Sequence, residues 1–298
     1  MSDVPTARPV PCIRRRAFTL IELLIVIAVI GLLVGILGPS LAGALDKARY
    51  ARWKASNAQW NTDSDCVVNF NFEVEGYQVE LSSGAKLDAL YNSAEGCDTE
   101  RFDSRDYAGV MVNGPQWSTG RWKYKRALQF DGVNDYVIVP TAEALDFDPA
   151  KDEFTVCVWV CFDRFAFGDC VFSKSQWGRS SQYTMYWYNG NMEADIGQTC
   201  VAYDSPKAKV GEWFCYTYVN RIDTGYQLYC NGESMHPAGA GSAVSPEAVP
   251  LGYFMLGAAG IWRNRVGSHF RGRIDECLVF KRALSIPEIR SLYTMGKP

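Results

Sequence analysis

The carboxylate of Glu22 lies inside a long apolar run, where a charged group is costly unless another group pairs with it. From Phe18 to Leu37 it is the one charged side chain. A helix of that length measures about 30 Å, which matches the hydrocarbon core of a bilayer. A charge within such a span costs roughly 2.5–3.5 kcal/mol. Because a lone span offers Glu22 no partner from its own chain, the pattern predicts a helix that assembles with copies of itself.

The sequence on either side of this run predicts how the segment is oriented and how far the helix extends. The arginine triplet 14–16 directly precedes the run, and such charges stay on the cytoplasmic side, so the C-terminal part should be exported. The run is longer than the roughly 7–15 apolar residues of a secretory signal peptide. Apolar residues continue at helical spacing through Leu45. We predict one helix from Phe18 to about Asn57, kinked at Pro39.

The segment Arg-Arg-Arg-Ala-Phe-Thr-Leu-Ile-Glu-Leu, residues 14–23, resembles the processing site of type IV prepilins and secretion-system pseudopilins. The resemblance implies that a prepilin peptidase cuts between Ala17 and Phe18 and that the new amine is methylated. It also implies that Glu22, the fifth mature residue, pairs with the N-terminus of a neighbouring subunit. Pro39 lies where many pilins carry a helix-kinking proline. The family usually has glycine at the position of Ala17, which is small enough that we still expect processing.

This resemblance implies a domain organisation and a location. Residues 1–17 would be a cleaved basic leader, and 18–60 a pilin-like helix with a transmembrane part at 18–38. The protein would cross the bacterial inner membrane once, with its C-terminal domain periplasmic or extracellular, and assembly in a pilus or in a secretion system both stay open. Pilin or pseudopilin subunits would be its partners through the N-terminal helix.

Charge and cysteine content narrow the class of protein further. The chain has a formal net charge of −3, and removing the basic leader makes it more acidic, which argues against a nucleic-acid partner. Of ten cysteines, only Cys12 lies in the leader, so an odd number remains in an oxidising compartment. With two histidines and no Cys-x-x-Cys, a zinc cluster is disfavoured. Disulfides and buried free thiols both remain open.

From Val67 onward the chain has the residue composition and pattern of a β-protein. Short runs rich in Val, Phe, Tyr, Trp and Thr alternate with Gly, Asn and Asp clusters, which indicates a sandwich or barrel. The run 154–160 is apolar on both faces, as in a strand that is covered on both sides. A final helix is predicted after Ser285, which forms a capping box with Glu288, and Gly296 closes it.

An ordered set of motifs resembles laminin-G-like, concanavalin A-like jelly rolls over about residues 65–296. The segments that carry it are 70–73, 109–115, 127–137, 154–160, 171–174, 211–213, 228–232, 270–276, 282–285 and 288–289. The expected fold is therefore all-β. It is a laminin-G/concanavalin A-like jelly-roll β-sandwich, residues 61–298, preceded by one long N-terminal transmembrane α-helix.

The jelly-roll resemblance implies a calcium ion and a glycan or extracellular protein ligand. Calcium prefers about 6–8 oxygen ligands. Asp131 and Asn134 crowd a turn at Gly132, and Asp275 is expected on a strand beside that turn, so these three residues are the candidate metal ligands. The alternative is an Asx turn at Asp131 and a solvated acid at Asp275.

Tryptophans are the candidate glycan-stacking residues. We expect ligand contacts from Trp177, Trp187 and Trp262. The alternative is packing in the core, since neighbours in the run Tyr186-Trp187-Tyr188 must point to opposite faces of a strand.

Three functions are compatible with these patterns. The leading hypothesis is a pilin-like, membrane-tethered surface protein that presents an exported jelly roll for glycan or protein binding. The second is a secretion-system pseudopilin or minor pilin with a filament-tip or cargo role. A jelly-roll glycoside hydrolase is less favoured, because Asp275 and Glu276 are adjacent and should point to opposite faces rather than form a catalytic pair. We expect no enzymatic activity.

Overall fold

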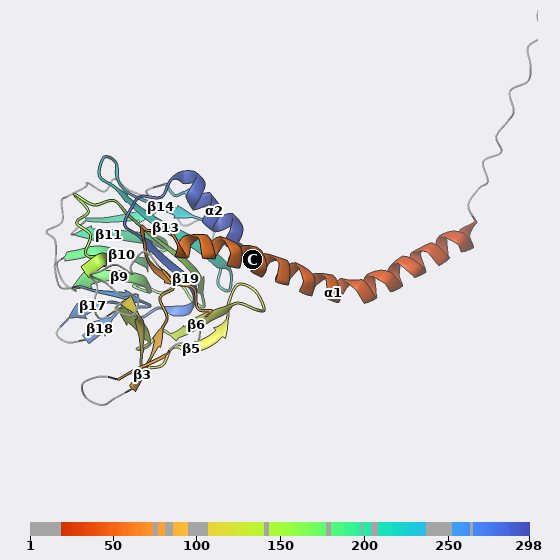
Figure 1. The fold of residues 1–298 in the computed structure, drawn as a ribbon. Helices are drawn as coiled ribbons and strands as arrows, with labels where there is room; N and C mark the ends of the chain where they lie inside the picture. The colour runs from red at the N-terminus through yellow and green to blue at the C-terminus, as the bar shows by residue number, and fades with distance from the viewer. Residues whose placement is uncertain are drawn as a thin grey trace, which may run out of the picture. The chain divides into compact units, whose positions relative to one another are not determined.

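The chain divides into two compact units, and the division falls inside its first helix. The computed structural model describes residues 19–73, 77–80, 86–94, 107–139, 143–176, 180–197, 199–203, 208–236, 252–262 and 265–298. Helix α1, Leu20–Asn61, is the first element (Figure 1). The units are Met1–Leu45 and Asp46–Pro298.

The long N-terminal helix is confirmed, and its last turns belong to the β-rich unit. α1 continues through Pro39 and ends four residues beyond the expected Asn57. Trp53, Asn57 and Trp60 recur every three or four residues and are only 3%, 4% and 7% exposed. The expected domain boundary at 60/61 therefore differs from the observed one at 45/46, because these side chains are packed into the second unit.

The second unit is a sandwich of two antiparallel sheets. The first sheet has the order β15-β14-β13-β8-β19-β6-β5, and β1 also pairs with β19. β19 is central, since it pairs with β8 on one side and with β6 and β1 on the other. The strands are β1 Cys66–Phe70, β5 Gln116–Thr119, β6 Arg126–Asp131, β8 Phe154–Phe162, β13 Trp213–Arg221, β14 Gly225–Cys230, β15 Glu233–Ser234 and β19 Arg271–Phe280.

The second sheet has the order β12-β11-β10-β9-β16-β7-β4-β3-β2, and a separate hairpin pairs β17 with β18 (Figure 1). Its strands are β2 Tyr77–Glu80, β3 Lys86–Leu90, β4 Gly109–Val112, β7 Tyr136–Val139, β9 Cys170–Gln176, β10 Ser180–Tyr188, β11 Asn191–Gly197, β12 Thr199–Tyr203 and β16 Tyr253–Leu256. The hairpin strands are β17 Ala259–Trp262 and β18 Arg265–Gly267, and a 3-10 helix spans Glu143–Leu145.

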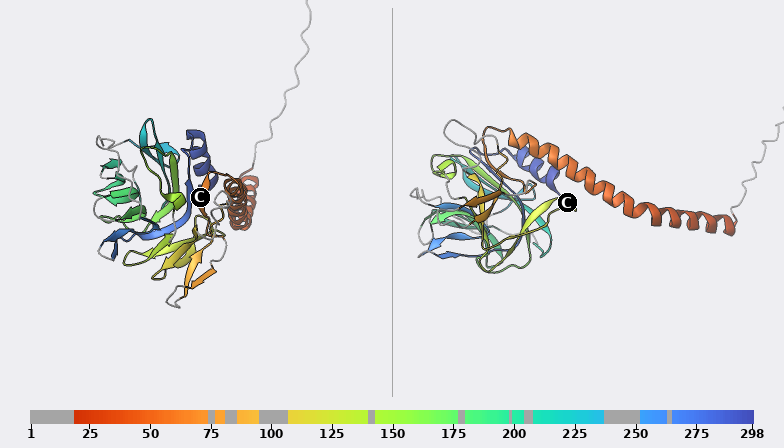
Figure 2. Two further views of the ribbon diagram at one scale, coloured as in Figure 1. Left: turned by 60° about the vertical axis from the view of Figure 1, so that its left-hand side comes forward. Right: turned by 60° about the horizontal axis from the view of Figure 1, so that its bottom comes forward.

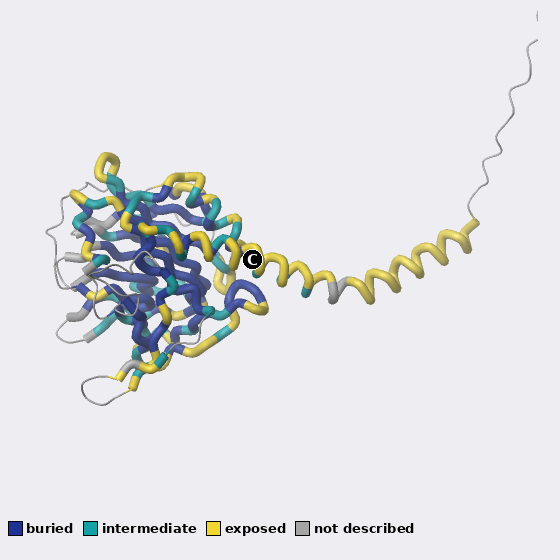
Figure 3. Tube along the Cα trace, viewed as in Figure 1, coloured by how far each residue is buried: buried dark blue, intermediate teal, exposed yellow. Residues whose placement is uncertain are grey.

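Buried residues gather in the strands of the β-rich unit (Figure 3). Their apolar side chains form two layers, one on each face of the first sheet. The larger layer lies between the sheets and includes Phe130, Val158, Phe172, Tyr183, Tyr218 and Ile274. The smaller layer includes Trp60, Cys157, Trp159, Leu278, Phe280 and Ile289. All nine residues of β8 are buried, which confirms the prediction of a strand covered on both faces.

Helix α2, Ile286–Gly296, begins with the predicted capping box. The Glu288 carboxylate accepts the backbone N–H of Ser285 at 2.8 Å and its hydroxyl at 2.7 Å. α2 lies beside the C-terminal part of α1 (Figure 2), and Arg52 donates to the carbonyl of Thr294 at 3.0 Å. The end of the chain is therefore bonded to the first helix.

Seven cysteines whose side chains the structure describes are buried free thiols: Cys66, Cys157, Cys161, Cys170, Cys215, Cys230 and Cys277. The side chain of Cys200, on β12, is not among those described. Cys157 and Cys215 approach each other, with their sulfurs 3.6 Å apart. They act as small apolar side chains of the core. Cys97 lies outside the described residues.

Candidate functional site

The start of α1 is an apolar surface with one carboxylate near its end. Residues Leu20–Leu37 are long and apolar enough to cross a membrane, and none of them is buried by the rest of the protein. The Glu22 carboxylate accepts both the N–H and the hydroxyl of Thr19 at 2.8 Å. Ala17 and Phe18, the expected cleavage residues, lie outside the described residues. Glu22 therefore has local hydrogen-bond donors but no cationic partner among the residues that the structure describes.

Asp131, the last residue of β6, forms an Asx turn with the residues that follow it. Its Oδ1 accepts the backbone N–H groups of Val133, Asn134 and Asp135 at 2.7, 3.2 and 3.4 Å. Gly132 has a φ of +73°, a conformation that glycine adopts without strain. Burial opposes ionisation, but the three N–H groups hold the pKa of Asp131 below its ordinary value.

The expected calcium site does not bring its three residues together. Asp131 faces Arg271 across the β6–β19 pair, whereas Asp275 lies four residues further along β19, roughly 13 Å away. Asn134 is exposed, and its carbonyl accepts the side-chain amide of Asn113 at 2.8 Å. Within the described residues, no three His, Cys, Asp or Glu side chains are grouped to hold a metal. A site shared by Asp131 and Asp275 does not fit, and calcium at the turn alone stays a prediction.

Asp275 is instead part of a buried ionic cluster, which we define as Arg121, Lys125, Asp275 and Glu276. Its Oδ1 lies 3.2 Å from Arg121 Nη2 and 2.9 Å from Lys125 Nζ. Its Oδ2 accepts the backbone N–H of Arg121 at 2.6 Å. Burial alone would raise the pKa of Asp275, but the two cations hold it below the ordinary value. Asp275 is fully buried, which corrects its expected role as a metal ligand or solvated acid.

Glu276 connects this cluster to the end of α1. One oxygen lies 2.7 Å from Arg121 Nη2. The other accepts the side-chain amide of Asn57 at 2.7 Å and the indole N–H of Trp53 at 3.0 Å. The helix is thus bonded to the central strand through a carboxylate that is only 4% exposed.

Asp275 and Glu276 both reach Arg121, contrary to the expectation that they face opposite sides of the strand. The pairing of β19 with β8 shifts between Ile274 and Glu276, and such a bulge re-aims side chains locally. Gly120 lets the neighbouring loop approach, because a Cβ there would overlap the Asp275 carboxylate.

Aromatic rings and the end of α2 complete the surroundings of the cluster. The Arg121 guanidinium lies 4.3 Å from the centre of Trp159 and 4.9 Å from Trp122, and its Nη1 donates to the carbonyl of Gly296 at 3.0 Å. Lys125 Nζ lies 4.3 Å from the centre of Trp53. Such cation–π contacts are stronger when the cation is buried away from water.

The expected ligand tryptophans are not a surface group. Trp187 is 8% exposed and packs in the core, with its ring 4.3 Å from that of Phe165, so its predicted ligand contact is wrong. Its neighbours on β10 point the other way, as strand alternation requires. Trp177 lies outside the described residues, and the side chain of Trp262 is not among those that the structure describes.

Three other aromatic residues form an outward-facing group that we name the aromatic patch: Phe167, Tyr186 and Tyr188. Phe167 is 71% exposed, and its ring lies 4.4 Å from that of Tyr188. Tyr188 lies 6.1 Å from Tyr186, whose hydroxyl donates to Asp195 at 3.2 Å. The patch combines one exposed and two partly exposed aromatic rings with the carboxylate of Asp195.

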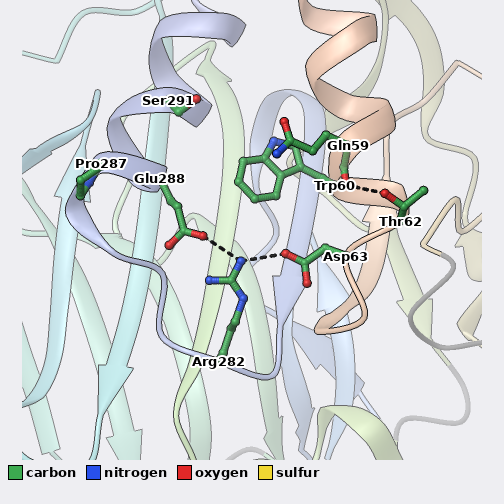
Figure 4. Close-up of a pocket in the computed structure, with 8 residues that line it drawn as sticks. All are labelled: Gln59, Trp60, Thr62, Asp63, Arg282, Pro287, Glu288 and Ser291. Carbon is green, nitrogen blue, oxygen red and sulfur yellow. Dashed lines mark hydrogen bonds and ion pairs between the residues drawn. The ribbon is translucent and has the colours of Figure 1, made fainter.

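An open cleft of about 420 Å³ lies between the end of α1 and α2 (Figure 4). Arg282 crosses it, with Nη2 2.7 Å from Asp63 and 2.9 Å from Glu288. The other residues that line the cleft are Gln59, Trp60, Thr62, Pro287 and Ser291. The carboxylates are paired with Arg282, so the groups left to meet a ligand are mainly hydroxyls and an amide.

Sequence reasoning missed Arg121, Lys125 and Phe167. The two cations lie in a loop between short strands, where a charge normally indicates a solvated surface. A signal existed for Arg121, since Trp122 adjoins it and cations pair with tryptophan rings. Phe167 carried no periodic signal.

Two family models match the chain. One, described as the concanavalin A-like lectin/glucanases superfamily, covers residues 131–290. The other, described as the prokaryotic N-terminal methylation motif, covers residues 12–38. The comparison with curated proteins gave no match.

Solved structures share the fold at low identity. A Trypanosoma rangeli sialidase bound to 2,3-difluorosialic acid has a TM-score of 0.54 at 15% identity, covering 86% of this chain and 40% of its own. A sialidase mutant from the same organism that displays trans-sialidase activity scores 0.52 at 12% identity, with the same coverage. The receptor-binding domain of botulinum neurotoxin C/D mosaic serotype scores 0.50 at 15% identity, covering 77% and 51%. The chain thus spans about half or less of these structures.

Proposed function

The chain belongs to the concanavalin A-like lectin/glucanases superfamily and begins with a prepilin-type methylation segment, and from these two facts we propose that it is a pilin-like surface protein presenting a glycan-binding jelly roll. The proposal joins an anchor, a connecting helix and a recognition surface. The aromatic patch on the sandwich is the observation that carries the recognition part.

The anchor would be the apolar part of α1 in the bacterial inner membrane. A prepilin peptidase would release Phe18 as the N-terminus, and Glu22 would then pair with the amine of a neighbouring pilin or pseudopilin. The cost of a carboxylate in lipid favours such pairing. The arginine triplet 14–16 would keep the leader cytoplasmic and place the sandwich in the periplasm or outside the cell. A secretion-system pseudopilin or minor pilin would use the same anchor.

The connection between anchor and sandwich supports a role in presentation. Trp53, Asn57 and Trp60 are buried in the β-rich unit, and two of them bond to Glu276. The last turns of α1 therefore move with the sandwich rather than as a loose linker.

Glycan binding is supported by the composition and exposure of the aromatic patch. Exposing a large apolar ring to water is unfavourable. The Phe167 ring is 71% exposed, which favours a role in binding over a role in core packing. Aromatic faces stack on the apolar faces of sugar rings, while carboxylates such as Asp195 accept sugar hydroxyls. An extracellular protein with a matching surface would be the alternative ligand.

We propose binding rather than catalysis. A retaining glycosidase needs two carboxyl groups about 5–5.5 Å apart that reach the substrate. Asp275 and Glu276 are adjacent to each other, but both are paired with Arg121 and almost fully buried. A substrate on the surface does not reach them.

A glycan array probed with residues 46–298 tests the proposal. We expect Phe167→Ala and Tyr188→Ala each to lower binding at least tenfold, since each removes a stacking surface worth roughly 1.4 kcal/mol or more. Tyr91→Ala is the matched control. Tyr91 is 41% exposed and directly follows β3, a strand that does not neighbour β10 in the second sheet.

Two outcomes would contradict the proposal. Glycan binding that survives both substitutions would move the ligand elsewhere, with the cleft crossed by Arg282 as the next surface to test. An array without any bound glycan, from folded protein, would favour an extracellular protein ligand.

A further inference from the structure

Two loops and two arginines meet at one end of the sandwich, next to the aromatic patch. β6 and β8 both run antiparallel to β19, so their last residues reach the same edge of the first sheet. The loops 132–135 and 163–169 follow these two strands. At Gly132 a Cβ would lie only 2.6 Å from the Cβ of Arg271 and 2.9 Å from Nη2 of Arg164. Glycine at this position therefore lets both arginines pack against the first loop.

A buried carboxylate, that of Asp169, fixes the shape of the second loop. One of its oxygens lies 3.1 Å from Nη2 of Arg164, and the other accepts the backbone N–H of Ala166 at 3.1 Å. The backbone N–H of Trp187 donates to the Asp169 carbonyl at 2.9 Å. The loop is thus tied to β10, and its member Phe167 is held in the aromatic patch.

The two arginines leave a surplus of positive charge at this rim. Burial raises the pKa of Asp169, whereas the hydrogen bond from Arg164 and the charges of both arginines act to lower it. Asp169 is 2% exposed and can neutralise only one guanidinium. The Arg164 side chain is 41% exposed, and Arg271 is exposed as well. Within the part of the chain that the structure describes, no carboxylate lies within 4 Å of the Arg271 guanidinium.

This surplus stands out because the chain as a whole is acidic, with a formal net charge of −3. Attraction of an anion must therefore come from local placement rather than from overall charge. A guanidinium has a planar fork of donors that matches a carboxylate or a sulfate. Phe167 follows Arg164 by three residues, a stretch of chain that spans at most about 10 Å. One oligosaccharide can reach both the ring and the cations.

We propose that the aromatic patch binds an acidic glycan, whose rings stack on Phe167 and Tyr188 while its carboxylate or sulfate group is bound by Arg271 and the exposed side of Arg164. Arg271 is the residue that reads the charge, because Arg164 is already paired with Asp169. The inference rests on the proposed function for the stacking surface. It adds the chemical class of the ligand.

Matched pairs of glycans on an array, probed with the full-length chain in a neutral detergent, test this inference. One set pairs hexuronate oligosaccharides with their methyl esters, and the other pairs sulfated oligosaccharides with their desulfated forms. Each pair keeps the sugar rings and removes only the charge. We expect the charged member to bind about tenfold more tightly in one of the two sets, which also tells a carboxylate ligand from a sulfate ligand. The preference should shrink as salt concentration rises.

Two substitutions on β19 separate a specific contact from general charge attraction. Arg271→Gln should abolish the preference for the charged member and leave binding of the neutral member unchanged, since the rings remain. Arg273→Gln is the matched control, because it changes the net charge equally on the same strand. The Arg273 guanidinium donates to the Thr119 carbonyl at 3.2 Å and lies 5.2 Å from the centre of the Trp213 ring. The preference should survive this control substitution.

Three results would overturn the inference. Equal binding of charged and neutral members would remove the acidic ligand and leave the proposed glycan binding intact. Equal loss of the preference in Arg271→Gln and Arg273→Gln would show general charge attraction instead of a contact at the rim. Folded protein that binds neither member of any pair, nor any other glycan, would refute the proposed function and this inference with it.

Discussion

Replacing Arg121 with methionine should destabilise the β-rich unit more than almost any other single change of charge. The Arg121 side chain is fully buried and contacts two buried carboxylates and the Gly296 carbonyl. Breaking a buried ion pair by removing one partner costs about 3–5 kcal/mol, because the remaining charge is left without compensation. Methionine fills similar space and keeps contact with the rings, so the loss should reflect mainly the charge.

The effect is large enough to measure by denaturation of residues 46–298. For a unit of this size, a loss of about 4 kcal/mol lowers the melting temperature by roughly 8–16 °C. Arg290→Met is the matched control, since Arg290 and its partner Glu233 are 57% and 73% exposed and lie 3.2 Å apart. An exposed pair of this kind contributes about 1 kcal/mol or less.

A second substitution distinguishes lost charge pairing from lost packing. In Arg121→Met, Asp275 keeps Lys125 at 2.9 Å, but Glu276 keeps only the neutral donors Trp53 and Asn57. Adding Glu276→Gln removes the unpaired charge and should restore about half of the lost stability.

The pH dependence gives an independent sign. In the wild-type protein the pKa of Asp275 is depressed, so its contribution is present above the ordinary carboxyl range and is lost as pH falls below about 4. Arg121 contributes more than Lys125 to holding the pKa of Asp275 down, so the deficit of Arg121→Met should be largest at neutral pH and shrink as pH falls below about 4. The reasoning is refuted if the single variant loses under 1 kcal/mol, or if Glu276→Gln rescues nothing at neutral pH.

Three further predictions follow from other parts of the chain. Glu22→Ala should leave membrane insertion intact, because a costly charge is removed, but should reduce recovery in sheared filament fractions; undiminished recovery would contradict its role in assembly. A fragment starting at residue 62 should be less stable than one starting at 46 by about 3–5 kcal/mol from Trp53 alone, as measured by urea unfolding, and equal midpoints would contradict the observed boundary. Asp131→Ala should lower stability by about 0.5–1.5 kcal/mol through three lost hydrogen bonds, since water can reach most of the freed N–H groups of this exposed turn, and a chelator response present in wild type but absent in this variant would establish calcium at the turn.

Much of the fold was predictable because it follows from local periodicity. The apolar helix, the fully covered strand 154–160 and the capping box at Ser285 each have a signal within a few neighbouring residues. The boundary at 45/46 has no such signal. The residues before and after it have the same helical periodicity, and the sequence does not show which of them pack onto the sandwich.

The site was predicted less well because it depends on contacts between distant segments. Asp275 meets Arg121, which lies 154 positions earlier in the chain, and a strand bulge turns Glu276 toward the same cation. Neither the pairing nor the bulge has a local signature. Strand alternation did predict that only some members of the run 186–188 face outward. Which of them do so depends on the position of β10 in the second sheet, and the sequence does not show that position.

The central position of β19 has a consequence for how the domain is made. This strand is the last in sequence, yet it pairs with β8, β6 and β1, and the carbonyl of Gly296 closes on Arg121. The sandwich therefore cannot complete its central sheet until nearly the whole chain has been synthesised. Export of the β-rich unit, as proposed above, would then act on an unfolded chain, because the central sheet is completed only when β19 joins β1, β6 and β8.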